Sequence, residues 1–310
     1  MEVQIAITPQ LIIDLLLILT VAWTMGKVFV RFGLPVMLGE LLAGLIIGPT
    51  CLGIITASDS LALLSELGIF FAMFYAGMEL NPKELVGHIK PSLAVAFGGF
   101  ILPFALGYVA ATAFGATLFQ ALVVGMGLSV TAIAVQAVVL ENMRILNTDI
   151  GHIIIGAAIV DDILSLITLS VLLGIARSGV FEFLPLVGIV LKVTAFFGLS
   201  IVAGQFLVPK LLRRLGDYHA KGFTFAIVSA LIMAYLAELA GLHLILGAFL
   251  AGQFVRKEIM DENIYRKIKD RFFALSYGFL TPVFFVSLSF HRRWTQLFGQ
   301  PEKEISSEQR

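Results

Sequence analysis

Two adjacent aspartates, Asp161 and Asp162, stand in the middle of a long apolar stretch of the chain. The residues on either side, Ile150–Val160 and Ile163–Leu173, contain His152 as their only titratable side chain. This stretch is long enough to cross a bilayer, so both carboxylates are predicted to lie near the middle of a membrane. A charged carboxylate at that depth costs about 2.5–3.5 kcal/mol on insertion scales, which makes the pair a candidate functional site.

Neighbouring residues on a helix point about 100° apart. One aspartate can therefore face a water-filled cavity while the other faces a neighbouring helix or a broken helical segment. A carboxylate in such a place can hold a proton or a hard cation such as Na⁺, which is expected to favour oxygen ligands as Ca²⁺ and Mg²⁺ do. Competition between the two for one carboxylate is already an exchange mechanism. A structural acid, hydrogen-bonded within a helix bundle, is the alternative interpretation.

A second informative stretch, Gly125–Ala134, precedes the aspartates. It carries Gly125, Gly127, Ser129 and Thr131 at alternate positions, which weakens a helix interior. Transporters use interrupted helices to expose backbone groups to an ion near the membrane midplane. We therefore predict a broken helix here, with close packing of small residues as the alternative.

Three further acids, Glu40, Glu66 and Glu238, are candidates to line the route of an ion. A structural hydrogen bond is an equally good explanation for Glu40 and Glu66. Histidine side chains can serve as pH sensors, but an interfacial histidine is the favoured interpretation of His152. The single cysteine, Cys51, excludes an internal disulfide and a thiolate metal cluster, and we expect no cofactor.

The composition requires a membrane environment. Of 310 residues, 59% are hydrophobic and 14% are charged, and the mean hydropathy is +0.98. A soluble protein needs far more polar surface, so we predict an all-α polytopic membrane protein embedded in a lipid bilayer. The formal net charge of zero gives no indication of a nucleic-acid partner. The N-terminus lacks a basic region and a cleavage site, so the first apolar segment is expected to be retained.

Ten apolar segments are candidate transmembrane helices. They cover residues 10–30, 34–56, 61–78, 91–114, 117–140, 150–176, 184–208, 222–240, 242–255 and 272–290.

The distribution of basic residues predicts how these segments are oriented. The odd-numbered connections hold 15 Lys and Arg residues, whereas the even-numbered ones hold only Arg177. The positive-inside rule then places the odd connections in the cytoplasm and the N-terminus outside. Residues 1–290 are expected to form the transmembrane domain and residues 291–310 a polar tail. With ten spans this tail would lie outside the membrane, where the positive-inside rule disfavours its basic residues. We therefore expect that the chain stops one or more helices early.

Six stretches together resemble the monovalent cation:proton antiporter-2 family. They follow in order over residues 10–290, and their linkage makes the resemblance specific. The stretches are Leu34–Gly53, Ile69–Leu80, Leu128–Gln136, Val160–Leu164, Leu246–Gly252 and Pro282–Phe290.

The resemblance implies a sodium/proton antiporter fold in a multi-pass protein of a prokaryotic plasma membrane. Such a protein is a homodimer with a dimer domain and a core domain, which move against each other in alternating access. By this resemblance Asp162 binds the transported cation or the proton, and Asp161 is its partner. Thr131 and Ala132 mark the broken helix, and Ser129 lies beside them.

Two departures from the family pattern are visible. Electrogenic relatives carry a lysine in the stretch matching Pro282–Phe290, whereas this chain has Ser287 and Ser289, as in electroneutral members. The family also continues for two or three more helices, including a second broken helix, so the second inverted repeat is expected to be incomplete. Na⁺ is favoured over K⁺ because a high-field carboxylate prefers the smaller ion.

Two other functions remain as alternatives to a cation/proton antiporter. A truncated, transport-incompetent paralogue would only insert into the membrane and dimerise. An intramembrane aspartyl protease is disfavoured, because its two acids must share one water and adjacent acids on one helix diverge.

Overall fold

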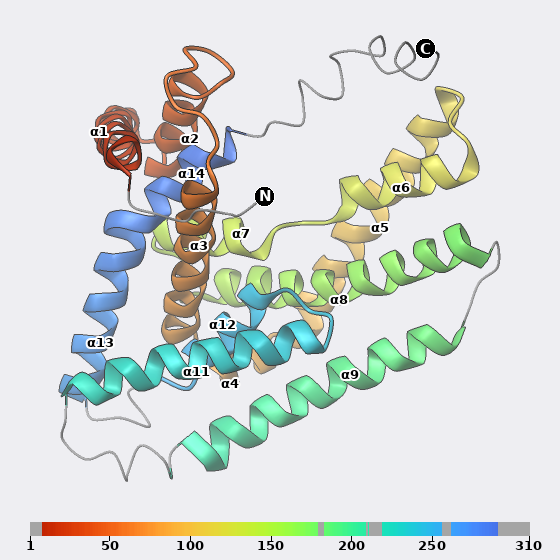
Figure 1. Ribbon diagram of the computed structural model, residues 1–310. Helices are drawn as coiled ribbons and strands as arrows, with labels where there is room; N and C mark the ends of the chain where they lie inside the picture. Colours follow the sequence, from red (N-terminus) through yellow and green to blue (C-terminus); the bar gives the residue numbers. More distant parts are fainter. Residues whose placement is uncertain (1–7, 179–182, 209, 211–218, 256–261, 291–310) are drawn as a thin grey trace, which may run out of the picture. The chain divides into compact units, whose positions relative to one another are not determined.

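The computed structural model describes residues 8–178, 183–208, 210, 219–255 and 262–290, and all regular elements in these ranges are helical (Figure 1). In chain order they are α1 (Pro9–Arg31), α2 (Val36–Ile47), α3 (Asp59–Glu79), α4 (Pro82–Gly87), α5 (Ile89–Ala113), α6 (Leu118–Ser129), α7 (Ile133–Asn142), α8 (Asp149–Ser178), α9 (Phe183–Val202), α11 (His219–Leu239), α12 (Leu244–Gly252), α13 (Glu262–Leu275) and α14 (Thr281–Leu288). Two π-helical turns follow α9 and α13, at Ala203–Leu207 and Ser276–Leu280.

The predicted fold class is confirmed. Within the described residues, seven helical segments are long and apolar enough to cross a membrane, and two further apolar helices are shorter. The seven segments are Pro9–Arg31, Asp59–Glu79, Ile89–Ala113, Leu118–Asn142, Asp149–Leu172, Gly222–Leu239 and Tyr265–Leu288. The shorter helices are Val36–Ile47 and Val187–Val202.

Three of the predicted segments differ from the helices that form. The second was predicted over 34–56, but α2 ends at Ile47 because Pro49 follows Gly48 and a proline cannot continue a helix. The ninth, 242–255, contains α12, whose nine residues span about 14 Å and are too short to cross a bilayer. The last was predicted to start at 272, whereas α13 begins at Glu262, because polar residues continue its amphipathic pattern outward.

The chain forms two compact units. Of the described residues, the first contains those from 8 to 69 and from 277 to 290, and the second contains those between 70 and 276. In the first unit α1, α2 and α14 pack around a core that includes Ile18, Ala43 and Val286.

Two serines at the C-terminal end of α14 connect this helix to α3 and α2 by hydrogen bonds. The hydroxyl of Ser287 donates to the hydroxyl of Ser65 at 2.7 Å, and the hydroxyl of Ser289 donates to the carbonyl of Leu41 at 3.2 Å. Both serines of the stretch Pro282–Phe290 therefore make neutral hydrogen bonds within the first unit.

The second unit holds the aspartate pair and is arranged around α8. The antiparallel pair of α5 and α6 packs against one part of α8, and α7 packs against another (Figure 1). The turn between α5 and α6 is followed by a capping box, in which Thr117 and Gln120 satisfy each other's backbone N–H groups. α11 and α12 form a second tightly packed pair, as adjacent helices joined by a short loop usually do.

Small residues allow α5 and α6 to approach closely. A Cβ at Gly125 would lie 2.7 Å from the carbonyl oxygen of Phe104, so a side chain there would require the helices to separate. Gly127 has open space around its Cα. Small-residue packing therefore accounts for Gly125, while the interruption predicted from the same stretch also forms, a few residues later.

We expect Gly125→Ala to destabilise the protein by about 1–3 kcal/mol, because the new methyl group overpacks the contact with α5. Gly127→Ala is the matched control, since it adds the same methyl group on the same helix where there is room for it. It should be neutral or stabilise by about 0.5–1 kcal/mol, because alanine is the better helix former. Thermal unfolding of the purified protein in detergent measures both, and equal melting temperatures for the two variants would contradict the packing.

Candidate cation-binding site

The predicted broken helix lies between α6 and α7. Ser129 is the last residue of α6 and Ile133 the first of α7. Between them the backbone is extended, with φ/ψ of −70°/128° at Val130 and −79°/104° at Ala132. The end of α6 and the start of α7 therefore expose carbonyl and N–H groups that no helical partner satisfies.

Asp161 satisfies one of these groups. Its carboxylate oxygen Oδ2 accepts a hydrogen bond from the backbone N–H of Thr131 at 2.9 Å, and the residue is only 5% exposed. No side chain caps the N-terminus of α7 from within the helix itself. The carboxylate from α8 instead binds the extended segment just before α7, where its negative charge favours the positive end of the α7 dipole.

Asp162 has different surroundings from its neighbour. Its oxygen Oδ2 is shielded from solvent, and so is the hydroxyl of Ser165, one helical turn further along α8. Neither atom has a hydrogen-bond partner within the part of the chain that the structure describes. Buried polar atoms are nearly always paired, so two unpaired oxygens on one face of a helix point to a bound species.

A cavity of about 440 Å³ adjoins these two residues. It is much larger than the ~30 Å³ that one molecule occupies in liquid water, so it has room for several waters or a partly hydrated ion. α6, the break after it, α8, α11 and the start of α12 supply the walls. The lining residues are Met126, Val130, Asp162, Ser165, Leu166, Leu169, Glu238, Gly241, Leu242, His243 and Leu244.

Comparisons with known proteins identify the family. A family description, "Sodium/hydrogen exchanger, transmembrane", matches residues 15–297. The chain is 33% identical over 280 residues to the probable Na(+)/H(+) antiporter GerT of Bacillus cereus, covering 89% of this chain and 72% of that protein. The chain belongs to the sodium/hydrogen exchanger family.

Two more similarities bear on the fold and on related proteins. The Na(+)/H(+)-K(+) antiporter GerN of Bacillus cereus is 33% identical over 265 residues, which are 85% of this chain and 67% of that protein. The solved structure of the sodium proton antiporter MjNhaP1 from Methanocaldococcus jannaschii superposes with a TM-score of 0.58 at 20% identity, over 91% of this chain and 70% of that one. This second likeness shows a shared fold.

Membership of the exchanger family confirms several expectations. The chain is an integral, multi-pass membrane protein, and its family consists of transporters rather than enzymes. The geometry agrees, because the two carboxylates lie in different surroundings, one at Thr131 and the other at the cavity. They do not meet as a protease dyad must.

The structure brings together some of the predicted site residues of this exchanger-family chain. Thr131 contacts Asp161 directly, and Glu238 lies on the same cavity as Asp162. Ala132 lies in the break, at the N-cap position of α7. The buried hydroxyl of Ser129 donates to the carbonyl of Met126 at 2.9 Å, within its own helix.

The other two predicted acids belong to the first unit. Glu40 is 8% exposed and lines a cavity of about 810 Å³ there, together with Lys27 and Arg31. Glu66 is exposed on α3. Neither is part of the unit that holds the aspartates.

Two polar residues of the cavity, Ser165 and His243, were missed by sequence reasoning. Ser165 was detectable, because residues three apart on a helix share a face and Asp162 was already identified. His243 caps α12, its Nδ1 accepting from the N–H of Ile245 at 3.4 Å. Segment 242–255 is too short to span a membrane, and this could have indicated that α12 begins within the protein, close to the aspartates.

We expect Asp161→Ala to destabilise the protein by about 1.5–3 kcal/mol, because a hydrogen bond from the backbone N–H of Thr131 to a charged carboxylate is lost. Asp161→Asn keeps an acceptor oxygen and should cost clearly less. Thermal unfolding in detergent measures both variants, with Asp59→Asn as the control, since Asp59 is an exposed acid at the start of α3. Equal stability of the alanine and asparagine variants would show that the hydrogen bond to Thr131 contributes nothing.

Proposed function

We propose that this protein is a secondary active antiporter that exchanges a monovalent cation for protons across the membrane. One structural observation supports the proposal above all. Asp162, one of whose carboxylate oxygens is buried without a hydrogen-bond partner among the described residues, lines a cavity of about 440 Å³ next to an interrupted helix, in a chain of the sodium/hydrogen exchanger family.

In this mechanism Asp162 holds either a cation or a proton. When ionised, its carboxylate attracts the cation, and the unpaired hydroxyl oxygen of Ser165 supplies a second hard ligand from the same face of α8. Protonation removes the charge that holds the cation, so binding of one species releases the other. Alternating access to the two sides of the membrane then makes the competition an exchange.

Asp161 positions the site without binding the cation. Its hydrogen bond to Thr131 holds the break of the helix against α8, so the backbone at Thr131 and Ala132 stays next to Asp162's helix. Ser129 ends α6 on the other side of this break. An ion near the site would meet the polar ends of two half-helices rather than apolar side chains alone.

Glu238 provides a route for the cation to the site. It is exposed and lines the same cavity as Asp162. The predicted orientation of the chain places this end of α11 on the outer side of the membrane. A carboxylate at the entrance raises the local cation concentration, which increases the rate of arrival at Asp162.

We further propose that the exchange is electroneutral and favours Na⁺. One titrating carboxylate exchanges one cation for one proton, and the stretch Pro282–Phe290 carries neutral serines where electrogenic relatives have a lysine. A carboxylate of high field strength favours the smaller ion. Homodimerisation is proposed from the family resemblance.

We expect Asp162→Asn to abolish cation-driven proton movement, because asparagine neither ionises nor binds a proton at this position. The measurement uses the purified chain in lipid vesicles with an internal pH dye, to which Na⁺, Li⁺ or K⁺ is added outside. Exchange should be fastest with Na⁺ or Li⁺. The variant should insert and purify like the parent protein, since the two side chains have nearly the same shape.

Asp59→Asn is the matched control, because it removes an exposed acid that is remote in sequence from the site. It should exchange like the parent protein. Undiminished exchange in Asp162→Asn would exclude the mechanism, and no exchange by the parent chain with any of the three cations would exclude the antiport.

Electroneutrality is tested by imposing a membrane potential on the same vesicles. Each uncompensated charge that crosses would gain or lose about 2.3 kcal/mol per 100 mV, so an electrogenic exchange would change its end point strongly. We expect the equilibrium pH difference to follow the Na⁺ gradient alone. A shift of that end point with the potential would contradict one-for-one exchange.

Glu238→Gln should raise severalfold the external Na⁺ concentration needed for half-maximal exchange, while the maximal rate changes little. The reason is that the substitution removes charge at the entrance but leaves Asp162 in place. The effect should shrink at high ionic strength, because screening weakens the attraction. A lower maximal rate with unchanged half-saturation would show that Glu238 acts on a later step.

A further inference from the structure

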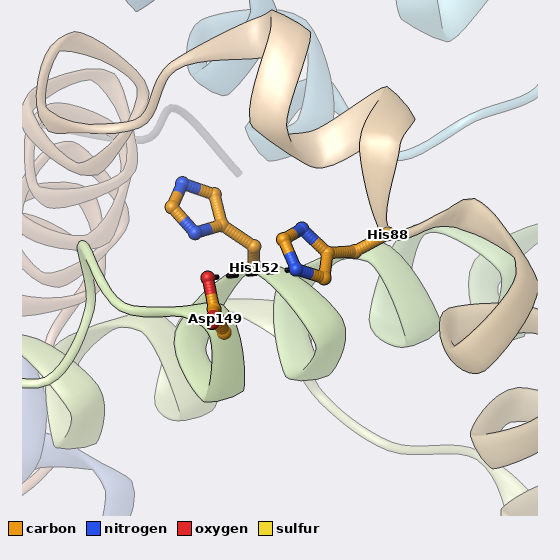
Figure 2. Close-up of side chains that lie close together, drawn as sticks. All are labelled: His88, Asp149 and His152. Atoms are coloured by element: carbon orange, nitrogen blue, oxygen red, sulfur yellow. Dashed lines mark ion pairs between the residues drawn. The ribbon is translucent and has the colours of Figure 1, made fainter.

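A cluster of metal-ligating side chains lies away from the aspartate pair, at the other end of α8. Asp149 and His152 stand on the first turn of α8, and His88 reaches them from the junction between α4 and α5 (Figure 2). Each offers one ligand atom, and these atoms all lie within 4.8 Å of one another. About twelve residues of helix, or about 18 Å, separate Asp149 from Asp161.

The ring of His88 is held so that its outer nitrogen can act as a ligand. Its Nδ1 lies 2.8 Å from the backbone carbonyl of Glu84, a contact that the ring makes by donating. In the neutral ring this leaves a lone pair on Nε2, which lies 3.5 Å from Oδ1 of Asp149. Fixing one nitrogen to a carbonyl while the other binds a metal is the usual arrangement of metal-bound histidines.

His152 is wholly buried and has no hydrogen bond. Its side chain is 0% exposed, and neither ring nitrogen has a hydrogen-bond partner within the described residues. Oε2 of Glu84 is the nearest charged atom, 3.4 Å from Nε2. A buried imidazole without hydrogen bonds lowers the stability of the folded protein. A metal ion that accepts the lone pair of one ring nitrogen would remove part of that cost.

The backbone around the cluster is packed tightly. A Cβ at Gly156 would lie 2.5 Å from the hydroxyl of Ser92, so only glycine lets α8 and α5 approach to this distance. The same hydroxyl donates to the carbonyl of His88 at 2.8 Å. The rings of His88 and His152 lie nearly parallel, 11° apart, with centroids at 5.9 Å. Close contact of α5 with α8 thus holds the two imidazoles next to each other.

We propose that His88, Asp149 and His152 form a binding site for a divalent transition-metal ion of the Zn²⁺ class, with Glu84 available as a fourth ligand. Imidazole nitrogens and carboxylate oxygens are the ligands that such ions take when no cysteine is present. Ligands around tetrahedral zinc lie roughly 3.3 Å apart, given bond lengths of about 2.0–2.1 Å. Nε2 of His88 and Oδ1 of Asp149 are already 3.5 Å apart. Rotation of the side chains would bring the remaining ligand atoms, which lie within 4.8 Å of one another, to a similar separation.

A surface ion pair is the competing explanation, and it accounts for less. A protonated His88 would pair with Asp149, whose side chain is 84% exposed, and exposed pairs contribute little to stability. That pair also leaves the buried ring of His152 without a hydrogen bond among the described residues, with only Glu84 at 3.4 Å as a charged neighbour. A metal ion satisfies both imidazoles and the carboxylate together, and it joins α8 to the α4–α5 junction.

The test is binding of Zn²⁺ alone to the purified 310-residue chain in detergent, measured by titration calorimetry, with Co²⁺ absorption as a second, spectroscopic readout. We expect one saturable site at micromolar Zn²⁺ and a higher melting temperature in its presence. His88→Gln and Asp149→Asn should each weaken binding by at least about tenfold and remove the thermal shift. Because no transport is measured, failure here leaves the proposed exchange untouched, and the reverse also holds.

Matched controls separate this site from general metal binding. His219→Gln removes a histidine from the start of α11. Asp59→Asn removes an exposed acid from the first turn of α3, and it matches Asp149, which is an exposed acid in the first turn of α8. Both should bind Zn²⁺ as the parent protein does. The His88 and Asp149 variants carry the test even if the fully buried His152 tolerates no replacement. The absence of saturable binding, or equal binding by the His88 and Asp149 variants, would overturn the proposal.

Discussion

The structure depends on the need to satisfy polar backbone groups where no water is available. Inside a bilayer every N–H and C=O must find a partner within the protein, so an interrupted helix is tolerated only where side chains or a cavity meet it. The break between α6 and α7 meets this condition through Asp161, whose carboxylate accepts the N–H of Thr131. The same bond fixes α7 against α8 and so places the break beside Asp162.

The neighbouring aspartates divide two tasks that one carboxylate cannot perform. A carboxylate committed to a backbone N–H is not free to exchange partners, because losing the bond would release the break of the helix from α8. Helical geometry turns the next side chain about 100° away, toward Ser165 and the cavity. A fixed acid and an exchangeable acid therefore arise from two consecutive positions, and the proposed competition between cation and proton needs only the second.

The all-helical membrane fold, the broken helix and the central aspartates were predictable from sequence, because a bilayer imposes strict length and polarity limits on each segment. Partners set by tertiary packing were not. Nothing local in the chain shows that His243 reaches the cavity of Asp162, or that Ser129 donates within its own helix. The sequence favoured His152 as an interfacial histidine, yet its ring is fully buried, because α5 packs over it at Gly156.

Opposite faces of α8 carry the two polar sites, and this follows from the same helical period. Asp149, His152 and Gly156 fall within about 60° of one another on the side that meets α5, whereas Asp161 lies about 180° from His152. A helix that buries polar groups on both faces needs a partner element for each. Here α5 approaches one face closely because of Gly156, and the broken α6–α7 segment meets the other.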